Sequence, residues 1–401
     1  MISYGLRYSF SVFFPTILAE FKWSRASTAG IFSLHLVSYG LISPISGRLA
    51  DRFGPRRVIP VGAIIMGLGM MACSMTSELW HFYLLYGVIV PVGICVSGWS
   101  QFVPTIARWF KKRRATALGL ASAGFALSFL LSSLTAPLII FIGWRGTFVV
   151  LGILPIAIIA PLSAFLLRTN PEDIGIQPEG NELGQTGVDG ASRLECTVQE
   201  AMGDYRFWAM FFAFFLVWGI GQSTIVAHQV VFIHDLGYSE TVAAIVLALF
   251  GVIEVLGNLS SSLADKYRRE RVYAVGALGL MASVVILMLT SRGGSGTWML
   301  YTYAIFFGFF NGLAGPVLSA IPADQFQGRN FGSINGILML GFGLGGALGP
   351  LLGGLIFDAT GTYTPVLYMV LFCFLISAAM IWVATNGRPR RDIEAKEQPE
   401  Q

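Results

Sequence analysis

Twelve long apolar runs constrain the fold of this chain more than any other feature of its sequence. A helix needs about 20 apolar residues to cross the hydrocarbon core of a bilayer, and every run is that long. The composition agrees, because 55% of the residues are hydrophobic and only 12% are charged. We therefore predict an all-α membrane protein with twelve transmembrane helices, at residues 1–21, 26–47, 58–77, 82–107, 115–142, 146–167, 206–233, 241–264, 272–291, 298–322, 331–357 and 364–385.

A polar stretch divides the twelve runs into two groups of six. It contains Pro171, Pro178, several glycines and most of the acidic residues in the middle of the chain, which is typical of a loop. The predicted organisation is a six-helix bundle at 1–168, a loop at 169–205, a second six-helix bundle at 206–385 and a tail at 386–401.

The two bundles repeat one another. The segment Gly47–Arg57, between the second and third runs, has a weaker counterpart in Ser261–Arg269, and the offset between Asp51 and Asp265 is 214 residues. Two parallel six-helix repeats are typical of secondary transporters, in which the substrate site lies between the repeats near the bilayer midplane.

Basic residues predict the orientation in the membrane. Arginine and lysine are concentrated in loops on the same side as the central loop, with clusters at 48–57 and 108–114, whereas the opposite loops hold few. Cytoplasmic loops carry the excess of basic residues in membrane proteins. We therefore expect a multi-pass protein of the cytoplasmic membrane with the central loop and both termini in the cytoplasm.

Other function classes lack their sequence signals. A formal net charge of +4 is too small and too scattered to indicate nucleic-acid binding. The four cysteines have no paired spacing, so a zinc site is not expected. The pattern Gly341-x-Gly343-x-x-Gly346 lies inside an apolar run, where close helix packing explains it better than a dinucleotide cofactor. We expect no enzyme activity, no cofactor and no metal, and coupling to a solute gradient rather than to ATP.

Charged residues inside apolar runs are candidates for function, because each costs about 2.5–3.5 kcal/mol to insert. Arg7 shares one stripe of the first run with Tyr4, Tyr8 and Ser11, and a polar stripe with one base suits an anion pathway. An arginine also binds a carboxylate through two parallel hydrogen bonds. Alternatively, Arg7 extends to the surface or pairs permanently with Glu254.

Glu254 is the only acidic residue well inside an apolar run. It could carry a proton, act as a fixed counter-charge, or form a structural ion pair. In the seventh run, His228 is a second candidate for proton coupling, and we expect it to share a cavity with Glu254. Amide side chains complete the predicted substrate site, at Gln222, Asn258, Asn311 and Asn335.

Two motifs carry a resemblance to a known family. The segment Gly47–Arg57 is similar to the loop signature of the major facilitator superfamily, and Arg108–Gly119 resembles the second signature of its monocarboxylate transporter branch, with the bacterial and oxalate/formate-exchanger relatives. The resemblance implies the major facilitator fold. It also implies a conformational latch formed by Asp51, Arg52, Arg56 and Asp265, in which Asp51 pairs with loop arginines and faces the start of the eleventh helix.

The chain departs from the branch at two places. The family's first signature would precede Met1, so we expect a clipped first helix and an internal start. In the eighth helix the family has an acidic residue followed four positions later by an arginine that resembles its carboxylate anchor. The matching residues here are Glu254 and Asn258, so the acid is present and the base is not.

These observations predict a secondary transporter that moves a small organic anion, preferably a carboxylate, by alternating access with a proton. An organic-anion exchanger and a carrier of a neutral or cationic solute bound by Glu254 are the alternatives. The predicted partners are the solute, the proton and membrane lipid, and we expect a monomer.

Overall fold

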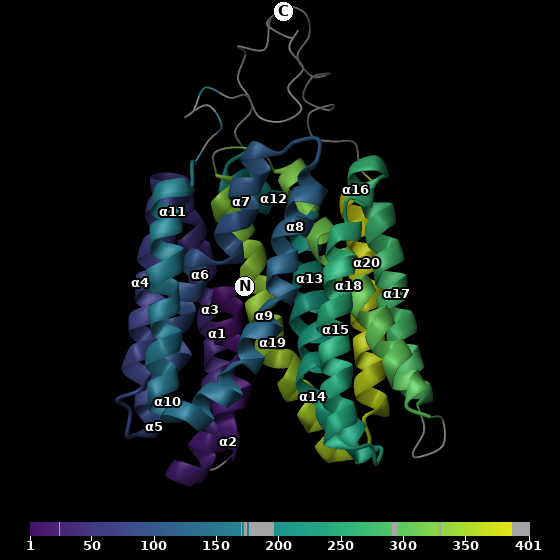
Figure 1. Ribbon diagram of the computed structural model, residues 1–401. Helices are drawn as coiled ribbons and strands as arrows, with labels where there is room; N and C mark the ends of the chain where they lie inside the picture. The colour runs from purple at the N-terminus through teal and green to yellow at the C-terminus, as the bar shows by residue number, and fades with distance from the viewer. Residues whose placement is uncertain are drawn as a thin grey trace, which may run out of the picture.

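The computed structural model of the protein is a bundle of helices (Figure 1). It describes residues 1–23, 25–169, 171, 175, 196–290, 296–326, 328 and 330–386, and within these residues it contains no strand. Most of the predicted central loop and nearly all of the predicted tail lie outside the described residues, as does Arg329.

The first half follows the six predicted runs, with several short breaks. The first run is broken at Ser9, and the fourth and sixth each contain a π-helical segment. The turn between the fifth and sixth runs lies inside one assigned helix, at Gly143, whose φ of 71° is in the left-handed region that glycine tolerates. The elements are α1 Ile2–Tyr8, α2 Phe10–Phe21, α3 Arg25–Phe53, α4 Pro55–Cys73, α5 Leu79–Leu84, η1 Leu85–Ile89, α6 Val90–Ser97, α7 Trp99–Trp109, α8 Arg114–Ala126, α9 Ser128–Ser133, α10 Thr135–Leu154, η2 Pro155–Ile159 and α11 Ala160–Leu166.

The short helix α12, Val198–Gly203, lies within the last part of the predicted loop, and Thr197 and Glu200 form its capping box. The seventh run, the first of the second half, contains a longer π-helical segment, η4. The elements are α13 Tyr205–Phe214, η4 Phe215–Gln222, α14 Ser223–Asp235, α15 Glu240–Ser260, α16 Leu263–Lys266, α17 Arg269–Leu289, α18 Trp298–Gln325, α19 Phe331–Thr360 and α20 Thr364–Thr385.

Nine of the described helices are long and apolar enough to cross a membrane by themselves. The other three predicted spans are the first and fifth, which short breaks divide into pieces, and the second, α3, which carries more polar residues. Helices α1 and α2 cover the first predicted span, α3 covers the second, and α8, α9 and the start of α10 cover the fifth.

The two halves meet at one end of the bundle, which we call the charged end because it carries Asp51 and Asp265. There α3 packs on α19, and α8 packs on α15 and α18. The ribbons diverge toward the opposite end, where α2 lies in the first half and α14 in the second (Figure 1). The bundle is therefore closed at the charged end.

Glycines allow the closest approach between the halves, at the crossing of α3 and α19. A Cβ on Gly40 would lie 2.9 Å from the Cα of Gly343, and one on Gly47 would lie 2.0 Å from the carbonyl oxygen of Gly332. At the same crossing Ser43 donates a hydrogen bond of 2.6 Å to the Gly336 carbonyl oxygen. The contact thus depends on residues without side chains, as in other tightly packed membrane helices.

Candidate functional site

A cavity of about 590 Å³, which includes some space open to solvent, lies between the two halves. Six aromatic side chains line it together with a few polar groups, most of which belong to the second half. A mostly apolar cavity with a small number of polar groups is typical of a small-molecule site. The lining residues are Tyr4, Tyr39, Trp99, Ser122, Phe125, Trp218, Gln222, Glu254, Asn258, Asn311, Gly315, Pro316, Met339 and Phe342.

Glu254 reaches this cavity from α15 and is only 4% exposed. One of its carboxylate oxygens accepts a hydrogen bond of 2.9 Å from the Asn311 side chain. The other oxygen has no hydrogen-bond partner among the described residues, and no ion pair within them includes Glu254. One helical turn further on, the Asn258 side-chain nitrogen also lacks a partner in the described structure. The carboxyl group is therefore buried without a compensating positive charge.

Arg7 lies one layer behind the cavity wall. Its guanidinium carbon is 5.2 Å from the centre of the Tyr39 ring and 5.5 Å from that of Phe342, and the side chain is 3% exposed. The Nε and Nη1 atoms have no hydrogen-bond partner among the described residues. Arg7 is thus neither extended to the surface nor paired with Glu254, although Tyr8 lies within electrostatic range of both. The site contains one base and one acid that are held apart.

The polar stripe predicted around Arg7 is divided by the break at Ser9. Tyr4 lines the cavity, and its hydroxyl lies 3.3 Å from the Tyr39 hydroxyl. Tyr8 packs edge-to-face on Phe125 at 5.9 Å without being part of the cavity lining. Ser11 follows the break, is exposed, and donates to the Tyr8 carbonyl oxygen. The structure therefore places Tyr4 in the cavity and Ser11 outside it.

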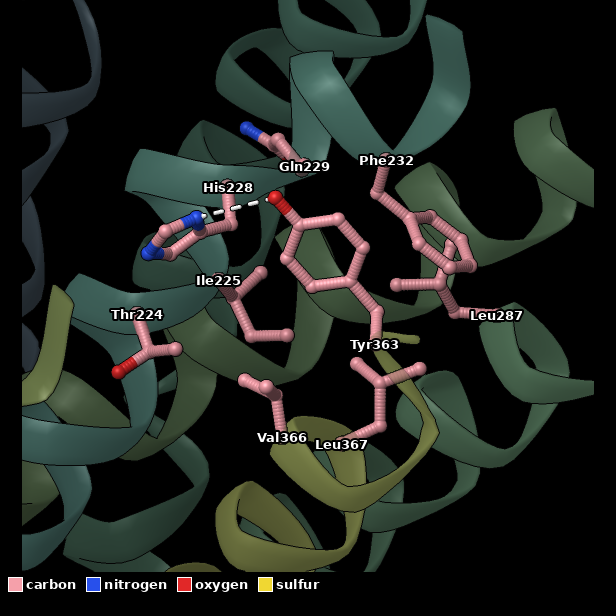
Figure 2. A pocket seen from close by; sticks show the side chains of 9 residues that line it. All are labelled: Thr224, Ile225, His228, Gln229, Phe232, Leu287, Tyr363, Val366 and Leu367. Carbon is pink, nitrogen blue, oxygen red and sulfur yellow. Dashed lines mark hydrogen bonds between the residues drawn. The ribbon is translucent and has the colours of Figure 1, made fainter. Parts of the chain in front are cut away.

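His228 does not share the Glu254 cavity, contrary to the expectation from sequence. It lines a separate pocket in the second half (Figure 2). Its ring nitrogens lie 3.3 Å from the Tyr363 hydroxyl and 2.9 Å from the Pro350 carbonyl oxygen. Residues 224 and 228, one turn apart on α14, both line this pocket, which explains the displacement: that face of the helix is turned toward α19 and α20.

The predicted amide residues are also separated. Gln222, Asn258 and Asn311 line the cavity. Asn335, on α19, is fully buried outside the cavity lining, and neither polar atom of its side chain has a partner within the described residues. Three of the four predicted amide side chains therefore line the same cavity.

Asp51 contacts the opposite half at the charged end. Its carboxylate accepts hydrogen bonds from the backbone nitrogens of Gly332 and Ser333, at 3.0 and 2.7 Å, and from the Ser333 hydroxyl at 2.8 Å. These groups form the start of α19, where exposed N–H groups favour a negative charge. The basic partner of Asp51 is Arg108, at 3.2 Å.

The two arginines predicted for the latch lie elsewhere. Arg52 stacks on the neighbouring Phe53 ring at 5.2 Å, and Arg56 donates to the Ala164 carbonyl oxygen at 2.8 Å. Both contacts stay within the first half. The expected pairing of Asp51 with these loop arginines is replaced by the pairing with Arg108, because the end of α7 brings Arg108 beside the carboxylate.

Asp265 makes the matching contact in the second half. It accepts hydrogen bonds of 2.8 Å from the backbone nitrogens of Ala115 and Thr116, at the start of α8, and one of 2.7 Å from the Thr116 hydroxyl. Beside it, Arg114 of the first half forms an ion pair of 2.5 Å with Asp324, which also pairs with Arg269. Charged contacts thus connect the halves on both sides of the charged end.

Comparison with known proteins now identifies the family. The model of the Major Facilitator Superfamily matches residues 1–293 and 233–401, and so covers the whole chain. The chain belongs to the major facilitator superfamily. Proteins of this superfamily are membrane transporters with two six-helix repeats, and the chain is not an enzyme.

Curated relatives within the superfamily are monocarboxylate transporters. The chain is 28% identical to monocarboxylate transporter 13 of Bos taurus, over 95% of this chain and 85% of that protein. It is 29% identical to monocarboxylate transporter 4 of Rattus norvegicus, over 90% and 75% of the two chains. It is 28% identical to monocarboxylate transporter 11 of Homo sapiens, over 97% and 80%.

Solved structures confirm the superfamily fold. The E. coli fucose:proton symporter superposes with a TM-score of 0.71 at 14% identity, over 96% of each chain. A proton:xylose symporter superposes with a TM-score of 0.75 at 15% identity, over 95% of this chain and 93% of the other.

Sequence reasoning missed the aromatic wall of this superfamily member. Tyr39, Trp99, Trp218 and Phe342 line the cavity, but the apolar runs contain many other aromatic residues that face lipid or core. For Trp218 a signal exists only in the structure, since it belongs to the π-helical segment η4. Such segments occur frequently at functional sites.

Proposed function

We propose that the chain is a secondary transporter that carries a small organic anion, a carboxylate in particular, together with a proton by alternating access. The observation that carries the proposal is the uncompensated pair of charges at the cavity. Within the described residues, no basic side chain pairs with Glu254, and two of the Arg7 nitrogens have no hydrogen-bond acceptor. A substrate carboxylate would neutralise Arg7, and a proton would neutralise Glu254. Binding both ligands together therefore removes two unfavourable buried charges.

The contacts of Arg7 make anion binding sensitive to conformation. Tyr39, whose ring contacts the guanidinium, belongs to α3 of the first half, and Phe342, whose ring also contacts it, belongs to α19 of the second. A movement of one half relative to the other would therefore change the contacts and the exposure of Arg7. The ring pair thus supplies a state-dependent cover over the anchor.

The closed charged end corresponds to one state of the transport cycle. If the charged end faces the cytoplasm, as the basic loops predict, the structure is closed on the cytoplasmic side and the cavity is reached from outside. The cell membrane is the proposed location. Release into the cell would then require the contacts of Asp51 and Asp265 to break.

Proteoliposomes that contain a pH-sensitive dye test the proposal. Adding a carboxylate outside should acidify the lumen faster than in protein-free liposomes, which measure passive entry of the uncharged acid. The Arg7→Gln variant should behave like protein-free liposomes. Equal acidification in all three preparations contradicts the proposal. Uptake of a neutral or cationic solute instead would favour a carrier that uses Glu254 as its binding charge, and substrate exchange without acidification would favour an anion exchanger.

A further inference from the structure

Three rings of the cavity wall form a continuous row, which we call the aromatic row: Tyr39, Phe342 and Trp218. Tyr39 meets Phe342 edge-to-face with ring centres 6.0 Å apart, and Phe342 meets Trp218 edge-to-face at 6.4 Å. Tyr39 belongs to the first half of the bundle and the other two rings to the second. A ligand that lies on the row therefore touches both halves.

Arg7 places a positive charge behind the Tyr39–Phe342 part of the row. The Arg7 guanidinium lies 5.2 Å from the Tyr39 ring centre and 5.5 Å from that of Phe342. At the other end Trp218 packs on Phe214, with ring centres 4.9 Å apart. A ligand with a flat apolar body and one negative group therefore fits the row in a single orientation.

The spread of aromatic side chains over the cavity wall also favours a substrate larger than a two- or three-carbon acid. A short acid near Arg7 would leave Trp218 uncovered, together with the edge-to-face pair of Tyr4 and Phe125, whose ring centres are 4.7 Å apart. An aromatic body would cover these surfaces.

We propose that the preferred substrate is an aromatic monocarboxylate, with its ring on the aromatic row and its carboxylate toward Arg7. The inference rests on the proposed function and narrows it to acids with an aryl body. Favourable contacts between aromatic rings add about 0.5–1.5 kcal/mol beyond buried area, which is about a 2- to 12-fold gain in affinity. An acid with an aromatic ring should therefore bind more tightly than an acid with a saturated ring of the same size.

Calorimetric titration of the purified protein separates the two proposals. The probes are phenylacetate, its saturated analogue cyclohexylacetate, acetate and the uncharged phenylacetamide. We expect phenylacetate to bind about 2- to 12-fold more tightly than cyclohexylacetate, with acetate and phenylacetamide weaker than both. Acids that bind without preference for the aryl group overturn this inference and leave the proposed function standing. Failure of every acid to bind contradicts both proposals.

Two variants test the placement of the ring. Trp218→Leu should remove the preference for phenylacetate over cyclohexylacetate, whereas Trp218→Phe should keep it and provides a second test if the leucine variant does not fold. Trp382, exposed on α20, is the matched control, and Trp382→Leu should leave the preference unchanged. An aryl preference that persists in Trp218→Leu shows that the ring binds elsewhere and overturns the proposed placement.

Discussion

Asp51 and Asp265 occupy equivalent positions, 214 residues apart, and each accepts two backbone hydrogen bonds from the first turn of a helix in the opposite half. Asp51 contacts the start of α19, and Asp265 contacts the start of α8. The internal repeat thus yields two reciprocal contacts at the same end of the bundle. Both must break before the halves can separate there.

Neutralising Asp51 should destabilise the closed charged end. In Asp51→Asn the hydrogen bonds lose their ionic character and the Arg108 pair is removed. Hydrogen bonds to charged groups contribute about 1.5–3 kcal/mol, so the balance between closed and open states should shift by roughly 10- to 100-fold. Electron–electron distance measurements between labels at Arg57 and Lys266, exposed residues of opposite halves, should report a larger open population.

Arg52→Gln is the control for the Asp51 variant, because Arg52 stacks on Phe53 within its own half of the bundle. Its distance distribution should match that of the unmodified protein. A shift in Arg52→Gln as large as in Asp51→Asn would show that the loop arginines hold the closed state after all.

Replacing Arg7 by lysine should weaken binding even though the positive charge is kept. A guanidinium can offer a carboxylate two parallel hydrogen bonds and stacks on aromatic faces such as those of Tyr39 and Phe342, whereas an ammonium does neither as well. We expect affinity for a carboxylate to fall by about 10-fold, measured by titration calorimetry. Arg145→Gln, which removes the half-exposed ion pair with Glu20, should leave affinity unchanged. Equal affinity in Arg7→Lys would argue against anchoring by this residue.

His228→Ala should affect stability more than binding. The imidazole connects α14 to the Pro350 carbonyl oxygen and to the Tyr363 hydroxyl, and each hydrogen bond contributes about 0.5–1.5 kcal/mol. The melting temperature should therefore fall while carboxylate affinity stays constant. Tyr363→Phe removes one of these contacts and should lower the melting temperature less. A loss of affinity in His228→Ala without a change in melting temperature would return His228 to the substrate site.

The sequence predicted the features that depend on length and local chemistry. Apolar runs located the spans because every span must satisfy its backbone hydrogen bonds within a helix. The contact of Asp51 with α19 followed from a resemblance. The sequence did not predict the side-chain partners of Asp51 and His228, because these partners depend on the rotation of each helix about its axis. That rotation turns His228 away from Glu254 and places Arg108, rather than Arg52, beside Asp51.

The central claim is that Glu254 carries the proton that is coupled to transport. Glu254→Gln permanently mimics the protonated carboxyl and can still accept a hydrogen bond from Asn311. Asn311→Ala is the companion variant, which removes that hydrogen bond and keeps the carboxyl group, so it should retain coupling.

The most direct measurement compares two assays of Glu254→Gln in proteoliposomes: accumulation of a carboxylate driven by an imposed pH gradient, and counterflow of the same carboxylate without a gradient. The account predicts that accumulation is lost while counterflow persists, because substrate exchange needs no proton movement. Gradient-driven accumulation equal to that of the unmodified protein would contradict the claim that Glu254 carries the proton.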